Sequence, residues 1–166
     1  MRHSLLYGAH ELTIDEKNRL PVPSKIRKQL NAGSEDESIF LFLIVGPNRK
    51  TWFYPEQYYE ELVFKQEPEM TPGEDSLMWD QMNFGLAGRV EVDKQGRILV
   101  DAKTLRRTGT NKEVTLVGVR DHLELWNRQD WDNHVEELER RRTEIAAAKR
   151  SSQSRQLPQQ DLGKSE

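Results

Sequence analysis

The hydrophobic residues of this chain recur in short alternating or continuous runs, which predict β-strands joined by tight turns. Residues 5–14 alternate loosely and are expected to form the first arm of a hairpin, whose return arm begins at Leu20. Residues 39–45 are the most apolar run, and this run is too short for anything but a buried strand. Residues 51–54 follow a Gly-Pro-Asn turn and are expected to pair back onto that strand.

Helical spacing separates these strands. A short helix is expected over residues 25–30, and an apolar stripe predicts a second helix after Pro55. Leu and Met recur at helical spacing between residues 74 and 87, which predicts a helix leading into the second half of the chain. A long final helix is expected after Asn127, which can serve as its N-cap.

One motif occurs twice: an apolar residue, an aspartate, three residues ending in Asn or Gly, an arginine, and then apolar residues. The aspartates are Asp15 and Asp93, which are 78 residues apart, and the arginines Arg19 and Arg97 have the same separation. Later matching positions are 72 residues apart, which places a six-residue deletion in the loop after the short helix. The chain therefore contains an internal repeat.

The second half is expected to follow the same order of elements as the first. A hairpin is predicted from residues 89–92 and 97–100, and a short basic helix from residues 103–107. Residues 114–119 correspond to the buried strand of the first half, and residues 123–126 to its partner.

Each motif is expected to form a tight turn that presents charge. Asn18 and Gly96 precede the arginines, and these residue types tolerate the positive φ that a short bulged loop requires. Asp15 and Asp93 can accept a hydrogen bond from a backbone N–H two residues on, and each can hold its own arginine across the loop. A single copy would most simply be an exposed hairpin with solvated charges; the duplication favours a functional role.

Length and composition bound the class of protein. At 166 residues with 35% hydrophobic content, the chain is expected to form one compact unit or two small fused ones, followed by a tail. The absence of cysteine excludes disulfides and thiolate metal sites. No apolar run approaches the roughly 20 residues that a membrane helix needs, so we expect a cytoplasmic protein with no membrane partner. The four histidines lack metal-binding spacing, and no metal, cofactor or small-molecule substrate is expected.

The formal net charge is −3, but the basic residues are concentrated on the repeated motifs. Residues 15–28 contain five basic and two acidic residues, and residues 93–107 have the same balance, so each segment carries +3. Residues 136–166 carry +1, which leaves −10 for the rest of the chain. A protein with this distribution is expected to touch a polyanion with one face and to repel it with the others.

The paired motifs and two later strands together resemble the MraZ family, which is built from tandem AbrB/SpoVT-type domains. The residues that carry the resemblance are 15–23 (DEKNRLPVP), 93–100 (DKQGRILV), 112–118 (KEVTLVG) and 123–126 (LELW). The resemblance extends over most of the chain before the tail. It implies an α+β fold in which two tandem swapped-hairpin AbrB-like β units pack as a pseudo-twofold body.

On this resemblance the chain is expected to divide into five segments. They are a first AbrB/SpoVT-like domain (8–57), a helical linker (58–85), a second AbrB/SpoVT-like domain (86–129), a C-terminal helix (130–150) and a disordered tail (151–166).

The resemblance also implies an oligomeric bacterial transcriptional regulator rather than an enzyme. Proteins of the family form ring-like homo-oligomers and bind direct DNA repeats upstream of the division and cell-wall gene cluster, which includes their own gene; such a protein would be cytoplasmic and nucleoid-associated. This chain departs from the family pattern at three positions. Asn18 replaces the usual Gly, Asp101 replaces a Pro or small residue, and Leu105 replaces an arginine of the short helix. The last two departures mean that the contact of the second motif is not carried over directly, or moves by one residue to Arg106.

If the two motifs lie side by side, Arg19 and Arg97 would point together toward double-stranded DNA. Arginine is the side chain best suited to bidentate recognition of guanine O6 and N7 in the major groove. Neighbouring basic residues would contact phosphates and set the register. The expected DNA-binding residues are Asp15, Lys17, Arg19, Lys25, Arg27, Asp93, Lys94, Arg97, Lys103 and Arg106.

Two other functions stay open. Aspartates contributed by duplicated halves form the shared-proton dyad of aspartic proteases, but the loop of those enzymes continues with Thr or Ser and then Gly. Here Glu16-Lys17 and Lys94-Gln95 follow the aspartates, so an aspartyl-dyad hydrolase is a remote alternative. The other alternative is an oligomeric protein-interaction scaffold without sequence-specific DNA binding, which the basic charge on the motifs disfavours.

Overall fold

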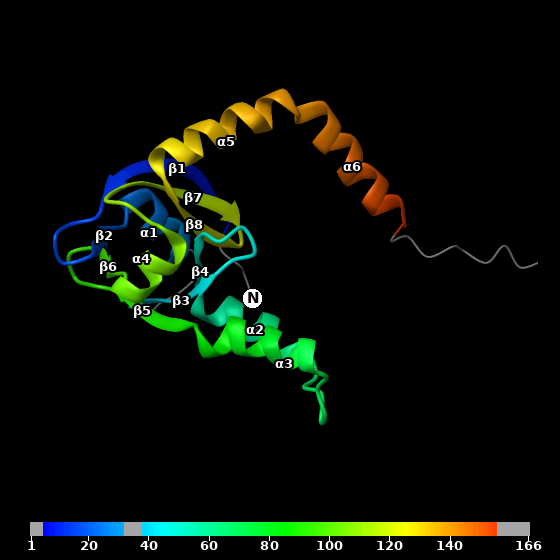
Figure 1. The fold of residues 1–166 in the computed structure, drawn as a ribbon. Helices are drawn as coiled ribbons and strands as arrows, with labels where there is room; N and C mark the ends of the chain where they lie inside the picture. Colours follow the sequence, from blue (N-terminus) through cyan, green and yellow to red (C-terminus); the bar gives the residue numbers. More distant parts are fainter. Residues whose placement is uncertain (1–4, 32–37, 156–166) are drawn as a thin grey trace, which may run out of the picture. The chain divides into compact units, whose positions relative to one another are not determined.

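The computed structural model describes residues 5–31 and 38–155, and the chain divides after Arg128 into two compact units. The first unit contains the sheet (Figure 1). Its elements, in order, are β1 (Leu6–Thr13), β2 (Arg19–Pro21), α1 (Ser24–Leu30), β3 (Ile39–Val45), β4 (Thr51–Pro55), α2 (Glu56–Phe64), α3 (Glu74–Asp80), the π-helix η1 (Gln81–Gly85), β5 (Gly88–Val92), β6 (Arg97–Leu99), α4 (Ala102–Thr108), β7 (Glu113–Arg120) and β8 (His122–Asn127).

Strands of the two halves are interleaved in one antiparallel sheet, in the order β1-β7-β8-β4-β3-β5. β1 pairs with β7 and β5 pairs with β3, so the first strand of each half joins the third strand of the other half. β4 and β8 pair at the centre. The order is symmetric about this central pair, which confirms the expected α+β fold of two swapped units related by a pseudo-twofold axis.

At the two motifs the turns of the expected hairpins form, but the strands on either side of each turn do not pair with each other. The return strands leave their own halves, because β2 pairs with β6 in a separate two-stranded ribbon. The prediction that residues 5–14 pair with the strand at Leu20, and residues 89–92 with residues 97–100, was therefore wrong. The exchange sets Leu20 directly opposite Ile98, and both side chains are completely buried. The later hairpins, β3–β4 and β7–β8, form as predicted.

The main core takes its side chains from both halves. Its fully buried members include Leu20, Ile26, Leu41, Phe53, Ile98, Leu116, Leu123 and Leu125. Burial of such side chains is the dominant favourable contribution to folding. Since each half supplies only part of this core, the two halves depend on each other for stability.

The two short helices begin differently. Ser24 is the first residue of α1 and does not cap it, because Pro23 occupies the N-cap position. The equivalent helix α4 is capped by Asp101, whose Oδ1 accepts a hydrogen bond from the Thr104 N–H at 2.9 Å. The departure from the family pattern at Asp101 thus supplies a favourable N-cap.

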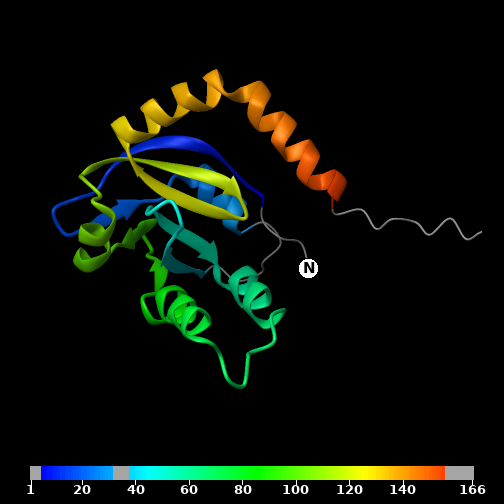
Figure 2. The ribbon, with the colours of Figure 1, turned by 45° about the vertical axis from the view of Figure 1, so that its right-hand side comes forward.

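The helix predicted between residues 74 and 87 is present as α3 followed by η1. It lies beside α2 (Figures 1 and 2), and the Tyr59 hydroxyl of α2 donates a hydrogen bond to the Asn83 carbonyl at 3.3 Å. Much of the apolar stripe on these helices is exposed. The exposed large apolar side chains here are Leu62, Phe64, Leu77, Met78, Trp79, Met82, Phe84 and Leu86.

A buried polar cluster joins the central strands. The ring of His122 lies between two carboxylates: Nδ1 is 2.6 Å from Asp121 and Nε2 is 3.1 Å from Glu124. Trp52 of β4 stacks on the imidazole at a centroid distance of 3.9 Å. Trp126 donates its ring N–H to Glu124 at 2.7 Å, so each member of the cluster has a polar or aromatic partner.

The second unit is helical in the part that the structure describes. A single final helix was predicted, but it breaks at Arg141 into α5 (Arg128–Arg140) and α6 (Arg142–Arg155). Asn127 was expected to cap the final helix, but its side chain makes other hydrogen bonds. Its Nδ2 donates to the Gly109 carbonyl, and its Oδ1 accepts from the Asn111 N–H. Residues 151–155, expected in a disordered tail, continue α6, which contains three alanines of high helix propensity. Residues 156–166 lie outside the described part of the chain.

Candidate nucleic-acid interface

The first motif forms a closed loop held by its aspartate. Asp15 Oδ1 accepts hydrogen bonds from the backbone N–H groups of Lys17 (2.8 Å) and Arg19 (2.9 Å), as the motif predicted. Its Oδ2 accepts from Arg19 Nε at 2.9 Å, and Asn18 adopts the predicted positive φ of 59°. Because Asp15 holds Nε, the terminal amino groups of Arg19 are the ones that can donate to an external acceptor.

The second loop has the same geometry. Asp93 Oδ1 accepts from the N–H groups of Gln95 (2.9 Å) and Arg97 (3.0 Å), and Oδ2 accepts from Arg97 Nε at 3.2 Å. Gly96 has a φ of 76°. Two loops built from different sequences therefore present their arginines with the same local support.

Both aspartates are held in the ionised form. The backbone N–H of Arg19 is the main cause that lowers the pKa of Asp15, and the N–H of Arg97 acts likewise on Asp93. A shared-proton dyad requires instead that one carboxyl have a raised pKa. The geometry therefore gives no support to an aspartyl-dyad hydrolase.

The two arginines lie on the same face of the β2–β6 ribbon. Arg19 is opposite Leu99 and Arg97 is opposite Pro21, while the intervening pair faces the core. Directly opposed residues in an antiparallel ribbon share a face, so Arg19 and Arg97 are diagonal neighbours on one face, an arrangement that typically sets residues about 7–8 Å apart. Reciprocal hydrogen bonds also join the two loops. The Val100 N–H donates to the Asn18 carbonyl at 2.9 Å, and the Val22 N–H donates to the Gly96 carbonyl at 2.7 Å. The loops accordingly lie next to each other (Figure 1).

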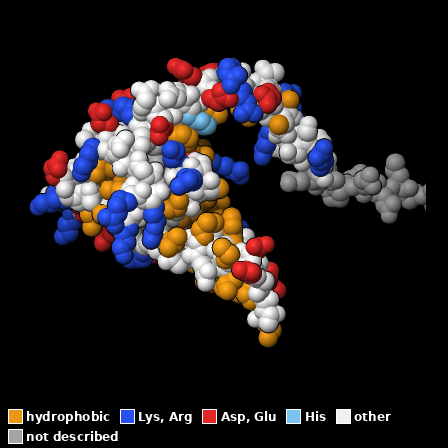
Figure 3. Space-filling view, viewed as in Figure 1, with side chains coloured by type: hydrophobic (Ala, Val, Ile, Leu, Met, Phe, Trp, Pro, Cys, Tyr) orange, Lys and Arg blue, Asp and Glu red, His pale blue; other side chains and the backbone are white. Residues whose placement is uncertain are grey.

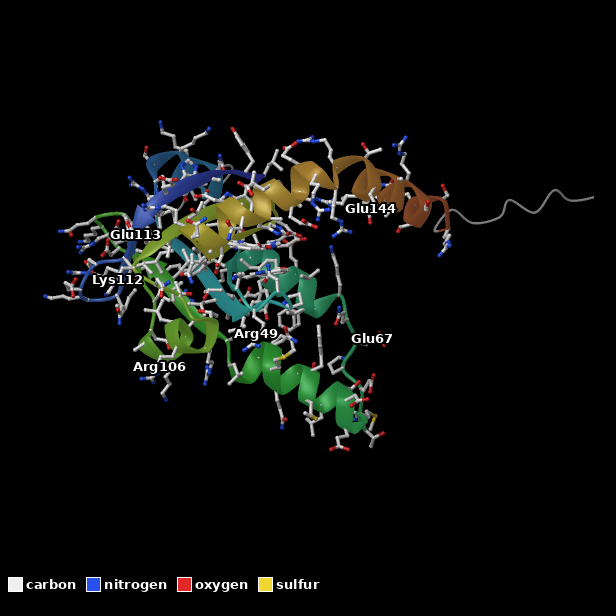
Figure 4. The ribbon with its side chains drawn as sticks, turned by 45° about the horizontal axis from the view of Figure 1, so that its top comes forward. Arg49, Glu67, Arg106, Lys112, Glu113 and Glu144 are labelled. Atoms are coloured by element: carbon white, nitrogen blue, oxygen red, sulfur yellow. The ribbon has the colours of Figure 1, made fainter. Side chains whose placement is uncertain are left out.

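Further basic side chains surround this ribbon. Lys and Arg gather near the two loops and near α4 (Figure 3), and Arg106 projects outward from α4 (Figure 4). Of the residues expected to contact DNA, five more are exposed here: Lys17, Lys25, Lys94, Lys103 and Arg106. Lys25 lies over the ring of Tyr7 at 5.2 Å from the ring centroid. The first unit thus has a basic face centred on the two arginines.

Comparison with known proteins agrees with the duplicated architecture. A model of the MraZ protein family matches residues 5–78 and again residues 84–153, one match to each half. The chain belongs to the MraZ family.

Three relatives share this family over most of their lengths. A protein named transcriptional regulator MraZ from Nitrosomonas europaea is 32% identical over 131 residues, which cover 78% of this chain and 85% of the relative. The protein of the same name from Methylobacillus flagellatus is 34% identical, covering 79% and 86%. That from Saccharopolyspora erythraea is 27% identical, covering 81% and 90%.

Arg27 is placed differently from the other expected contacts of this MraZ-family chain. It is half-buried, and its Nε donates to the Val22 carbonyl at 3.2 Å. Its guanidinium lies against the second loop: a Cβ built at Gly96 would be 3.0 Å from Arg27 Cζ. The structure therefore separates Arg27 from the exposed cations and brings it to Gly96.

One residue beside the loops was missed by sequence reasoning. This residue is Lys112, which is labelled in Figure 4. Its Nζ donates a hydrogen bond to the Asp15 carbonyl at 2.9 Å, and the Ile14 N–H donates to the Lys112 carbonyl at 2.9 Å. Lys112 was noted only as part of the strand motif that begins there. No local pattern places it beside a loop that is almost one hundred residues earlier in the chain.

Over residues 5–31 and 38–155, no group of three or more His, Cys, Asp or Glu side chains could hold a metal ion. Within the same ranges, no helix is long and apolar enough to cross a membrane.

Proposed function

We propose that this chain is a transcriptional regulator that binds double-stranded DNA through the face of the β2–β6 ribbon. The observation that carries the proposal is the pair of aspartate-supported arginines, Arg19 and Arg97, on one exposed face. Their guanidinium groups would donate to base edges in the major groove, where arginine recognises guanine. The fixed support from Asp15 and Asp93 reduces the entropy lost when the arginines bind.

The exposed cations around the ribbon would contact phosphates. Lys17 and Lys94 extend from the loops, while Lys25, Lys103 and Arg106 flank them on α1 and α4. Each neutralised phosphate contributes about −0.9 to the slope of log affinity against log salt concentration. Binding by one copy is therefore expected to be weak and strongly dependent on salt.

Self-association would overcome this weakness. The exposed apolar side chains of α2, α3 and η1 gather on one region (Figure 3), and we infer that a second copy of the chain covers them in a ring-like homo-oligomer. Large contiguous apolar patches are typical of protein–protein contact sites. An assembly would present several identical basic faces, and binding of the first would raise the effective concentration of the next.

The proposed target is a set of direct DNA repeats upstream of the division and cell-wall gene cluster, including the regulator's own gene. The name transcriptional regulator, shared by the relatives, supports a role in transcription, and the choice of these repeats follows from the family resemblance. Such a protein would act in the cytoplasm in association with the nucleoid, and the proposal assigns no catalytic role to any residue.

The decisive experiment measures binding to DNA that contains one, two or three copies of the upstream repeat, together with the mass of the free protein by light scattering. We expect an oligomer whose affinity rises steeply with copy number. Arg19→Ala should weaken binding by about 1–3 kcal/mol and relax sequence preference. Lys65→Ala is the matched control, because it removes one exposed positive charge outside the basic face.

Two results would contradict the proposal. One is a monomer that binds a single repeat as tightly as the array, and the other is an Arg19→Ala variant that binds as well as the Lys65→Ala control. A protein that assembles but binds no upstream DNA would instead favour the interaction scaffold.

A further inference from the structure

Arg27 covers the loop of the opposite half. It belongs to α1 in the first half, yet its guanidinium packs on Gly96 of the second loop, with Cζ and Nε both 3.0 Å from the position of a Cβ built there. Gly96 is buried, although it lies in a charged loop. The Gly96 carbonyl accepts a hydrogen bond from the Val22 N–H at 2.7 Å, and the Val22 carbonyl accepts from Arg27 Nε. Arg27, Val22 and Gly96 thus form one connected unit.

The first loop is supported in turn by a residue of the second half, and that residue is not the equivalent of Arg27. The position equivalent to Arg27 in the second half, 78 residues later, is Leu105, whose side chain has neither a charge nor an N–H to donate. Instead Lys112, which precedes β7 of the second half, donates to the Asp15 carbonyl at 2.9 Å. That carbonyl also accepts from the Asn18 N–H, so Lys112 acts on the turn itself.

We propose that Arg27 and Lys112 are positioning residues, each of which holds the DNA-reading loop of the other half in its binding conformation. This inference rests on the proposed DNA-binding function and assigns Arg27 a role other than phosphate contact. A phosphate contact needs only a positive charge within reach. The clamp on Gly96 needs the planar guanidinium, whose Nε bonds Val22 while its flat face packs on the glycine; the compact ammonium of lysine cannot do both.

The clamp also explains why the residue before the arginine is Asn18 in the first loop but Gly96 in the second. Asn18 and Gly96 both have a positive φ, a conformation in which asparagine is tolerated. A Cβ is accommodated at Asn18, whereas at Gly96 it would meet Arg27 at 3.0 Å. Glycine at residue 96 is therefore needed for the close approach of Arg27 as well as for its φ.

The first test separates positioning from charge by comparing Arg27→Lys with the wild type on the upstream repeats. If Arg27 positions the loop, Arg27→Lys should weaken binding about five- to tenfold, a fraction of the loss expected when a base-reading arginine is removed. The slope of log affinity against log salt concentration should stay unchanged in Arg27→Leu. Full affinity in Arg27→Lys, or a slope in Arg27→Leu that is shallower by about 0.9, would show a phosphate contact and overturn the inference.

The second test needs no DNA. Hydrogen exchange followed by mass spectrometry should show faster exchange in peptides over residues 93–100 in Arg27→Lys, with residues 15–20 unchanged. Lys112→Met should give the opposite pattern. Lys65→Met is the matched control, because Lys65 is an exposed cation at the end of α2, outside the basic face, and should alter neither loop. Unchanged exchange in both loops for both variants would refute the clamp.

The third test uses the contact between the two side chains. Gly96→Asn should weaken DNA binding in the wild-type background, since its Cβ meets Arg27, but should cost less in the Arg27→Leu background, where that contact is gone. Equal losses in the two backgrounds would mean that Arg27 and Gly96 are not coupled. If the wild type binds no upstream DNA, the proposed function fails, while the exchange measurement still decides whether the clamp exists.

Discussion

The buried cluster around His122 allows a stability prediction whose sign is set by pH. Burial by itself would lower the pKa of His122, but hydrogen bonds to Glu124 and Asp121 outweigh it and raise the pKa above the ordinary value of 6.5. With a carboxylate at each ring nitrogen, the imidazolium can donate two hydrogen bonds, whereas a neutral ring can donate only one. The protonated form is therefore the one that stabilises the fold.

The sign of the pH dependence follows from this shift. A group with a raised pKa in the folded state contributes stability that is fully present below its unfolded pKa and is lost as the pH rises through the folded value. For His122 the contribution is complete below about pH 6.5 and declines above it. Burial would raise the pKa of Glu124, but hydrogen bonds from His122 and Trp126 lower it, so its contribution is lost as the pH falls through that lowered value.

The perturbation is His122→Phe, which keeps a ring for stacking on Trp52 and removes both donors. Leaving buried carboxylates without their cation typically costs about 3–5 kcal/mol. We expect a loss of about 3 kcal/mol, at the low end of that range, because the Asp121 side chain is 33% exposed and water can replace part of its bond.

The assay is urea denaturation followed by tryptophan fluorescence, at fixed protein concentration, at several values between pH 6 and pH 9. The difference in unfolding free energy between wild type and His122→Phe should be largest near pH 6 and should shrink as the pH rises. Tyr54, beside His122, does not interfere, because burial raises the pKa of its hydroxyl to about 12. A difference that is constant across this range, or that grows toward pH 9, would refute the assignment of a protonated His122.

Three further variants test the packing and capping that shape the fold, each by urea denaturation. Gly118→Ala should destabilise the protein by about 1–3 kcal/mol, because the new Cβ would lie 2.3 Å from the Tyr7 backbone nitrogen where β7 meets β1; an unchanged midpoint would contradict that close approach. Ile98→Ala should cost about 2–5 kcal/mol, since the side chain is fully buried in the shared core, and unfolding should remain a single transition; two separate transitions would show that the halves fold independently. Asp101→Ala should cost about 1 kcal/mol by removing the N-cap of α4 and its bond to the Thr104 N–H, with Asp101→Asn as the control that retains most of the stability.

Much of the local structure was predictable because its causes lie within a few residues. The paired loops follow from an aspartate four residues before an arginine, with Asn18 or Gly96 able to adopt a positive φ, and the structure contains both loops. The apolar runs at β3 and β7 and their partner strands were also found from the pattern alone. These elements depend on short-range hydrogen bonds and on strand periodicity, which a sequence displays directly.

The strand exchange could not be derived from the residues around each turn. A return strand such as Arg19–Pro21 has the pattern of a local hairpin arm, and only the burial of Leu20 against Ile98 favours pairing with the other half. The local pattern is the same for both arrangements. The swapped topology was predicted only through the resemblance to a family.

The sequence alone therefore determined the repeat, the order of elements, the loop geometry and the concentration of positive charge on the two motifs. The tertiary structure decided which strands pair, that Arg19 and Arg97 share a face, and that Arg27 and Lys112 turn inward to the loops. The physical reason is separation along the chain. A turn is stabilised by neighbours within five residues, whereas the contact of Arg27 with Gly96, or of Lys112 with Asp15, exists only once the two halves have exchanged strands and buried a common core.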